Sequence, residues 1–189
     1  MKILQICNKV PYPANDGGAI AVLNLSRSFA DAGHEVTILA MKTPKHETSL
    51  DDIPDSLKDI IKFQIVSVDT TISFVKLILN LFFSKKPYNA IRFIDAAFKM
   101  KLIDLLLTNK YDVIQLEGLY LMPYISAIRE HCSSLIAYRS HNIESEIWSR
   151  IRKVSNNPLK RFYFGVIARR LGEYELNSLN SYDLLIPIT

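Results

Sequence analysis

The sequence predicts an α/β protein built on a doubly wound parallel sheet of about six strands, with helices on both faces. The first observation is a set of short, mostly apolar runs of the kind that form buried parallel strands. These runs are residues 2–7, 34–40, 63–68, 112–117, 134–139 and 182–189. The second observation is that segments with helical apolar spacing alternate with the runs. This alternation favours parallel strands joined by right-handed crossovers, which is a Rossmann-like architecture.

The N-terminal part of the chain predicts one compact strand-helix-strand unit. Residues 2–7 are almost continuously apolar, and a helix over 18–32 follows, with its apolar side chains on one face and Gly33 as its stop signal. The next strand, 34–40, comes directly afterwards, so the two strands should pair side by side and parallel. A short helix near 56–61 is expected before the third strand.

The most apolar segment of the chain is 72–83, and it has two interpretations. It carries apolar residues nearly all round and is followed by Lys85 and Lys86. One interpretation is a core or partly exposed helix. The other is an interfacial helix that leans on a membrane or a lipid-linked substrate, with its lysines facing anionic headgroups. At about 12 residues, with Lys76 inside it, the segment is shorter than the roughly 20 residues of a membrane span.

Helical spacing dominates the second half of the chain. Pro158 suits the first turn of the last helix, and Arg169 and Glu173 within it are expected to form an ordinary surface pair. Ser140 or Asn142 could simply be the N-cap of the helix before it, which is a structural alternative to a role in the site. The predicted helices cover 89–108, 119–131, a segment that begins near 144, and 158–180.

Composition limits the size and setting of the protein. With 189 residues and 49% hydrophobic content, the chain is expected to form a single domain over 1–189. A net charge of +4 is too small to indicate a nucleic-acid partner, although it suits an anionic ligand or a membrane surface. Cys7 and Cys132 have no disulfide-like spacing, so we expect buried thiols in a reducing cytoplasm. No signal peptide is expected before the first strand.

Three loops are predicted to form the functional site. They are 8–18, with Asp16, Gly17 and Gly18; the turn at Glu117; and the turn at His141 and Asn142. In a parallel sheet of order 3-2-1-4-5-6, these loops would line one crevice at the carboxyl ends of the strands. The glycines open a helix N-terminus, and its free amides favour an anion, most simply a phosphate.

Several familiar kinds of binding site are disfavoured because the sequence lacks their motifs. The first turn lacks the Gly-x-Gly-x-x-Gly of nicotinamide-binding domains, the Gly-Lys-Ser/Thr of a P-loop and the paired acids of a receiver domain. The histidines at 34, 46, 131 and 141 form no short pair with zinc-ligand spacing. We therefore expect no metal and no resident cofactor.

Each candidate residue also has a purely structural interpretation. Gly17 and Gly18 could form only a tight turn, and Glu117 could bind a ligand hydroxyl, act as a base, or be a surface carboxylate. Trp148 and Tyr120 could stack on a ligand ring, but such residues more often pack in a core. For His34 we expect the start of the second strand and no substrate contact.

The motifs together resemble the opening of the retaining GT-B glycosyltransferases of family 4, and the resemblance covers essentially the whole chain. It is carried first by Pro-x-Pro-x-x-x-Gly-Gly-Ala, then Asn24-Leu25 and Ala32-Gly-His-Glu-Val-Thr37. Further matches are Asp112-Val-Ile with Glu117, Ser140-His141-Asn142-Ile-Glu144, Arg170, Glu173, Glu175, Tyr182-Asp183 and a final Ile-Pro-Ile-Thr.

The resemblance implies one half of a two-domain enzyme. This chain would be the N-terminal, acceptor-side domain, and the C-terminal GT-B domain, absent here, would hold most of the nucleotide-sugar co-substrate. The glycine loop would approach the donor across the cleft, and His141 would face the transferred sugar in a positioning or electrostatic role. The acceptor would be a glycan or a lipid-linked molecule. This domain alone would be inactive.

Two rival functions belong to other classes. One is a free-standing module that binds a phosphorylated or sugar ligand without transfer, and the other is a dimeric scaffold that uses the open cleft face. We expect the protein to be cytoplasmic. If residues 72–86 contact lipid, it would be a peripheral protein at the inner face of the membrane.

Overall fold

The computed structural model describes residues 1–188 and has a six-stranded, all-parallel sheet in the order β3-β2-β1-β4-β5-β6. This confirms the predicted fold class, and the strand order reverses between β1 and β4. The strands are β1 Lys2–Cys7, β2 Glu35–Lys42, β3 Ile61–Ser67, β4 Val113–Glu117, β5 Leu135–Ser140 and β6 Leu184–Pro187. The helices are α1 Gly17–Asp31, α2 Asp55–Lys58, α3 Phe74–Phe83, α4 Tyr88–Ile91, α5 Ala96–Thr108, α6 Ile125–His131, α7 Glu144–Val154 and α8 Pro158–Ser178, with 3₁₀ turns η1 Leu50–Asp52 and η2 Leu119–Tyr124.

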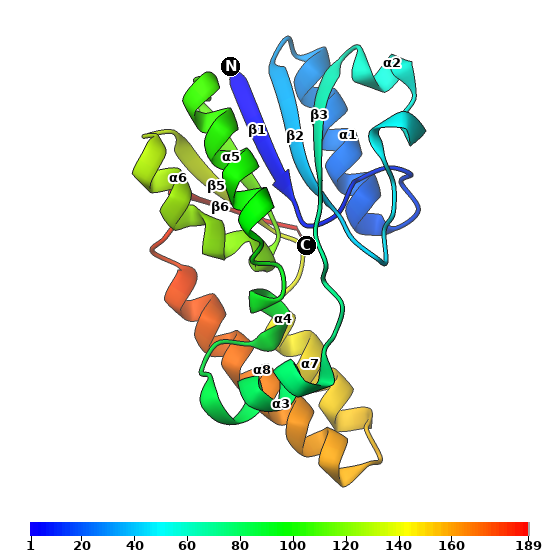
Figure 1. Cartoon of the computed structure of the whole chain (residues 1–189), viewed down its shortest axis with the longest axis vertical. Coiled ribbons are helices and arrows are strands. Elements are labelled where there is room, and N and C mark those ends of the chain that lie inside the picture. The colour runs from blue at the N-terminus through cyan, green and yellow to red at the C-terminus, as the bar shows by residue number, and fades with distance from the viewer. Residues whose placement is uncertain (189) are drawn as a thin grey trace.

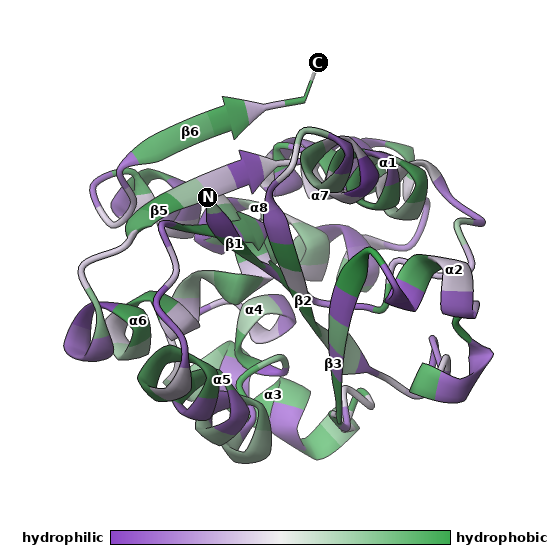
Figure 2. Ribbon diagram, turned by 90° about the horizontal axis from the view of Figure 1, so that it is seen from above, coloured by the Kyte–Doolittle hydropathy of each residue, from purple (hydrophilic) through white to green (hydrophobic). Residues whose placement is uncertain are grey.

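Helices cover both faces of the sheet because side chains alternate along each strand. On β1, Leu4 and Ile6 pack into one core with α5 and α6, whereas Cys7 packs with α1 and α2 in the other. Figure 2 shows α1 and α2 on one face of the sheet and α5 and α6 on the opposite face. Cys7 is buried and Cys132 partly buried, and both are free thiols.

A second group of helices, α3, α4, α7 and α8, lies beyond the carboxyl ends of the strands (Figure 1). Helices α7 and α8 pack against each other, with the Trp148 and Phe164 rings 5.6 Å apart. Arg170 of α8 holds the C-terminal end of α3 by donating to the carbonyl oxygens of Asn80 and Leu81, at 3.1 and 2.6 Å. Helix α8 therefore connects α7 and α3 next to the carboxyl ends of the strands, which is the edge where ligands bind in such folds.

The single helix predicted over 89–108 is wrong, because the chain breaks into α4 and α5. Asp95 caps α5 by accepting from the Phe98 amide at 2.9 Å. The Tyr124 hydroxyl accepts from the Asp95 amide and donates to the Phe93 carbonyl, at 2.9 and 2.7 Å. A buried tyrosine from a later segment thus stabilises the break, which helical spacing alone could not reveal.

Two further boundaries differ from the prediction. The segment predicted as one helix over 119–131 starts as a 3₁₀ turn that contains Pro123, and only α6 is α-helical. Strand β3 begins at Ile61, so the short helix before it ends at Lys58. In residues 1–188 no helix has both the length and the apolar character needed to cross a membrane.

Candidate functional site

A cavity of about 240 Å³ lies where β1, β4 and β5 end, at the reversal of strand order. Loops that are far apart in the sequence meet there because parallel strands present their carboxyl ends at one edge. Five of the predicted site residues line it: Asp16, Gly18, Glu117, His141 and Asn142. Gly17 lies just outside this lining and is exposed.

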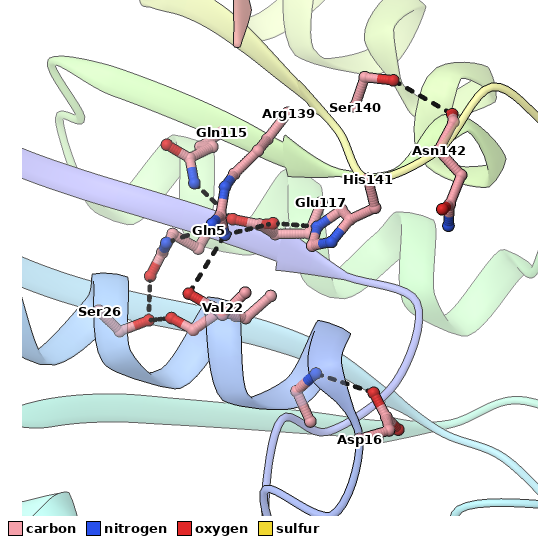
Figure 3. A network of polar contacts seen from close by, with 12 residues as sticks. Gln5, Asp16, Val22, Ser26, Gln115, Glu117, Arg139, Ser140, His141 and Asn142 are labelled. Atoms are coloured by element: carbon pink, nitrogen blue, oxygen red, sulfur yellow. Dashed lines mark hydrogen bonds and ion pairs between the residues drawn. The ribbon is translucent and has the colours of Figure 1, made fainter. Parts of the chain in front are cut away.

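Glu117 is the centre of a buried polar network (Figure 3). Its side chain is only 2% exposed, so the surface-carboxylate interpretation is wrong. One carboxylate oxygen accepts from Gln115 and, at 3.5 Å, from Gln5. The other accepts from Arg139 at 3.3 Å and from His141 at 2.6 Å. Because protein donors occupy both oxygens, Glu117 is placed to orient His141.

His141 presents one ring nitrogen to Glu117 and leaves the other for the cavity. Nε2 must carry the proton, because an ionised carboxylate can only accept. In the neutral ring Nδ1 is then an acceptor. It lies close to Gly18, since a Cβ added to that glycine would be 4.0 Å from Nδ1. The imidazole is 18% exposed, so it is reachable from the cavity yet held in place. Such a group can accept a hydrogen bond from a hydroxyl or stabilise positive charge.

The residues that support this pair escaped the sequence prediction. Gln5 is opposite Gln115 on neighbouring strands, and Glu117 is opposite Arg139. The Ser26 hydroxyl of α1 donates to Gln5 Oε1 at 2.6 Å, which completes the network on the α1 face. Polar residues at alternate positions of otherwise apolar strands were the signal that could have found this layer.

The N-terminus of α1 is less available to an external anion than predicted. The Asp16 carboxylate caps the helix by accepting from the Ala19 amide at 3.0 Å, and it is ion-paired with Lys9. Hydrogen bonds from Lys9 and the Ala19 amide lower the pKa of Asp16. The helix end therefore already holds a carboxylate, which stands where a phosphate was expected.

At the rim of the cavity, Tyr120 has a packing role. Its ring stacks on Phe93 with centroids 5.2 Å apart, and its hydroxyl donates to Glu144 at 2.6 Å. Burial raises the pKa of Glu144. Trp148 likewise packs against Phe164, and His34 follows α1 directly before β2, within 3.4 Å of the N-terminal amine.

The predicted N-cap of α7 is wrong. Ile143 occupies the cap position, and Ser140 donates its hydroxyl to the Asn142 carbonyl at 3.2 Å. The α7 N-terminus instead receives Glu175 of α8, which accepts from the Glu144 amide and the Ser145 hydroxyl, both at 2.6 Å. A long-range contact thus replaces the local cap. The expected surface pair of Arg169 and Glu173 is confirmed at 3.3 Å.

Fold and site together define a Rossmann-like α/β domain with a polar crevice at its topological switch point. The sequence matches no protein-family model and no curated protein. Among solved structures, it is similar to a UGT transferase from Siraitia grosvenorii in complex with UDP, at 9% identity and a TM-score of 0.45. The alignment covers 100% of this chain and 51% of that one, so the chain spans about half the length of this structure. Within residues 1–188 there is no cluster of histidine, cysteine and acidic residues that could hold a metal ion.

Proposed function

We propose that this chain is the acceptor-side domain of a retaining GT-B glycosyltransferase, which transfers a sugar from a nucleotide-sugar to a glycan or lipid-linked acceptor. The observation that carries the proposal is the Glu117–His141 pair facing Gly18 across the crevice. Three of the motifs behind the family resemblance come from separate parts of the sequence, yet they line this one cavity through Gly18, Glu117 and His141. A second, nucleotide-sugar-binding domain would close the crevice from outside.

In this proposal His141 positions the reacting sugar. Nδ1 accepts a hydrogen bond from a sugar or acceptor hydroxyl, while Glu117 fixes the ring orientation and its tautomer. Arg139 lies beside the same carboxylate and keeps the buried cluster from carrying an uncompensated negative charge. The chemistry needs no metal and no resident cofactor, since the leaving diphosphate would be held by the second domain.

Helix α3 supports a further part of the proposal, a peripheral contact with an anionic membrane. Phe74, Phe82 and Phe83 are 73%, 74% and 84% exposed, although aromatic side chains of this size are normally buried. Lys85 and Lys86 follow the helix and are exposed as well. An apolar helix face flanked by lysines suits the interface of a negatively charged bilayer.

The test of the site is sugar transfer by a two-domain protein that contains this chain. His141→Ala should reduce turnover by about 100-fold, which is typical for the loss of one group that stabilises a transition state. His131→Ala is the matched control, because within residues 1–188 the His131 ring bonds its own helix, at the Ala127 carbonyl. Equal turnover of the His141 variant and the parent protein would refute the assigned role.

A further inference from the structure

A second cavity, of about 420 Å³, adjoins the crevice and shares Asn8 and Lys9 with it. Its lining is strongly basic, and none of the residues from 1–188 that form it is acidic. The basic side chains are Lys9, Lys45, His46 and Arg92. Threonine hydroxyls and the Asn8 amide supply further hydrogen-bonding groups. The sequence motifs marked only the part of this cavity at Asn8 and Lys9, because its residues come from four separate segments.

Arg92 is held in place with part of its bonding capacity unused. Its Nη1 donates to the Thr70 carbonyl at 3.4 Å, and the guanidinium lies 5.0 Å from the centre of the Phe93 ring. Its Nε is buried and has no hydrogen-bond partner among the described residues. A ligand in the cavity cannot reach the buried Nε, so a phosphate oxygen would be bound by the terminal guanidinium nitrogens of Arg92.

His46 is also fixed, on the loop after β2. Its backbone exchanges two hydrogen bonds with Thr43, at 3.1 and 2.8 Å. Burial lowers the pKa of His46, and the charges of Lys9 and Lys45 lower it further, while Asp16 opposes them. Asp16 is itself paired with Lys9. An anion placed beside the ring would oppose this shift, because a nearby negative charge favours the protonated imidazole.

We infer that this basic cavity binds a phosphate group, and that the phosphate belongs to the acceptor. The acceptor assignment rests on the proposed function, whereas phosphate binding itself does not. A guanidinium, a lysine and a histidine in a cavity lined by no carboxylate suit an oxyanion with several acceptor oxygens. The shared wall at Asn8 and Lys9 lets an anchored acceptor extend towards His141.

A neighbouring cavity indicates where the rest of such an acceptor would lie. It shares Thr71 and Arg92 with the basic cavity and is lined by Leu79 and Phe83 of α3. A phosphate at Arg92 would thus have apolar surface on one side and the crevice on the other. Both a soluble phosphate ester and a lipid phosphate supply the required group, and only the lipid would use the apolar surface.

Calorimetric titration of this chain with inorganic phosphate tests the site. Lys45→Glu should weaken binding about tenfold, because it reverses one charge at the ligand. Lys110→Glu is the control, since it makes the same charge change at an exposed position just before β4, at the opposite edge of the sheet. Absence of phosphate binding by the parent chain, or equal binding by parent and Lys45→Glu, would overturn the inference.

Two further readouts sharpen the test. In histidine NMR titrations, phosphate should raise the pKa of His46; an unchanged His46 titration would count against the site. Dihexanoyl phosphatidic acid should bind more tightly than glycerol 3-phosphate if the acceptor is a lipid. Equal binding of the two compounds would indicate that the acceptor is a soluble phosphate ester. If phosphate fails to bind while His141→Ala still lowers sugar transfer by about 100-fold, only this inference falls.

Discussion

Oε2 of Glu117 lies 2.6 Å from Nε2 of His141, although the residues are 24 positions apart. The contact follows from strand register. Glu117 ends β4 opposite Arg139 of β5, and His141 is two residues further along, on the same face of the sheet. Gly118, with φ of 109°, then turns the chain out of β4 in a conformation that favours glycine. The sheet itself therefore sets the geometry of the proposed site.

Glu117→Leu should lower the free energy of unfolding by about 3–5 kcal/mol, because it leaves a buried arginine without its carboxylate. The Arg139 side chain is only 11% exposed. The double variant Glu117→Leu/Arg139→Met should recover part of the loss in urea unfolding experiments. A single variant as stable as the parent would show that the network contributes nothing.

Neighbouring glycines in the first loop should respond differently to alanine. A Cβ at Gly17 meets open space, and we expect Gly17→Ala to be neutral or to stabilise α1 by up to about 0.5 kcal/mol. A Cβ at Gly18 would lie 3.3 Å from Asp16 Oδ1, so Gly18→Ala should disturb the helix cap and cost about 1 kcal/mol. Thermal unfolding of both variants makes the comparison, and the reverse order of stability would contradict the described loop.

Adjacent arginines on α8 provide a second matched pair. Arg170→Met should cost about 1.5–3 kcal/mol, because a charged donor to the end of α3 is lost. Arg169→Met removes only an exposed pair with Glu173 and should cost less than about 0.5 kcal/mol. Hydrogen exchange should also accelerate in α3 for Arg170→Met alone. Equal effects of the two substitutions would mean that α3 is not held by Arg170.

Vesicle sedimentation tests the proposed membrane contact of α3. The parent chain should bind vesicles that contain phosphatidylglycerol more strongly than neutral ones. Lys85→Glu/Lys86→Glu should weaken this binding by at least about tenfold, since each lysine near an anionic surface contributes about 1 kcal/mol. Phe82→Ser/Phe83→Ser should weaken binding to both kinds of vesicle. If the lysine variant and the parent bind equally, the electrostatic part of the proposal is lost.

The sheet and the meeting of the three loops were predictable because they follow from local patterns. Apolar runs mark the strands, and parallel topology brings the turns after β1, β4 and β5 to one edge. The helix break at Asp95 was not predictable, since it depends on the hydroxyl of Tyr124, 29 residues away. The cap of α7 by Glu175 is equally long-range, at 31 residues.

The chemistry of the site was only partly predictable. The sequence pointed to Glu117 and His141 through their positions after strands, but it could not tell whether the carboxylate was buried. Arg139 lies at the end of a predicted strand, and the sequence alone indicates no role for it. Only the register of β4 and β5 shows that it faces Glu117.

The most direct test of the acceptor-side assignment is calorimetric titration of this chain with UDP- and GDP-linked sugars. If the donor is held mainly by a second domain, binding to this chain alone should be weaker than about 1 mM. Micromolar or tighter binding of a nucleotide-sugar, lost in His141→Ala, would place the donor site in this domain and contradict the account.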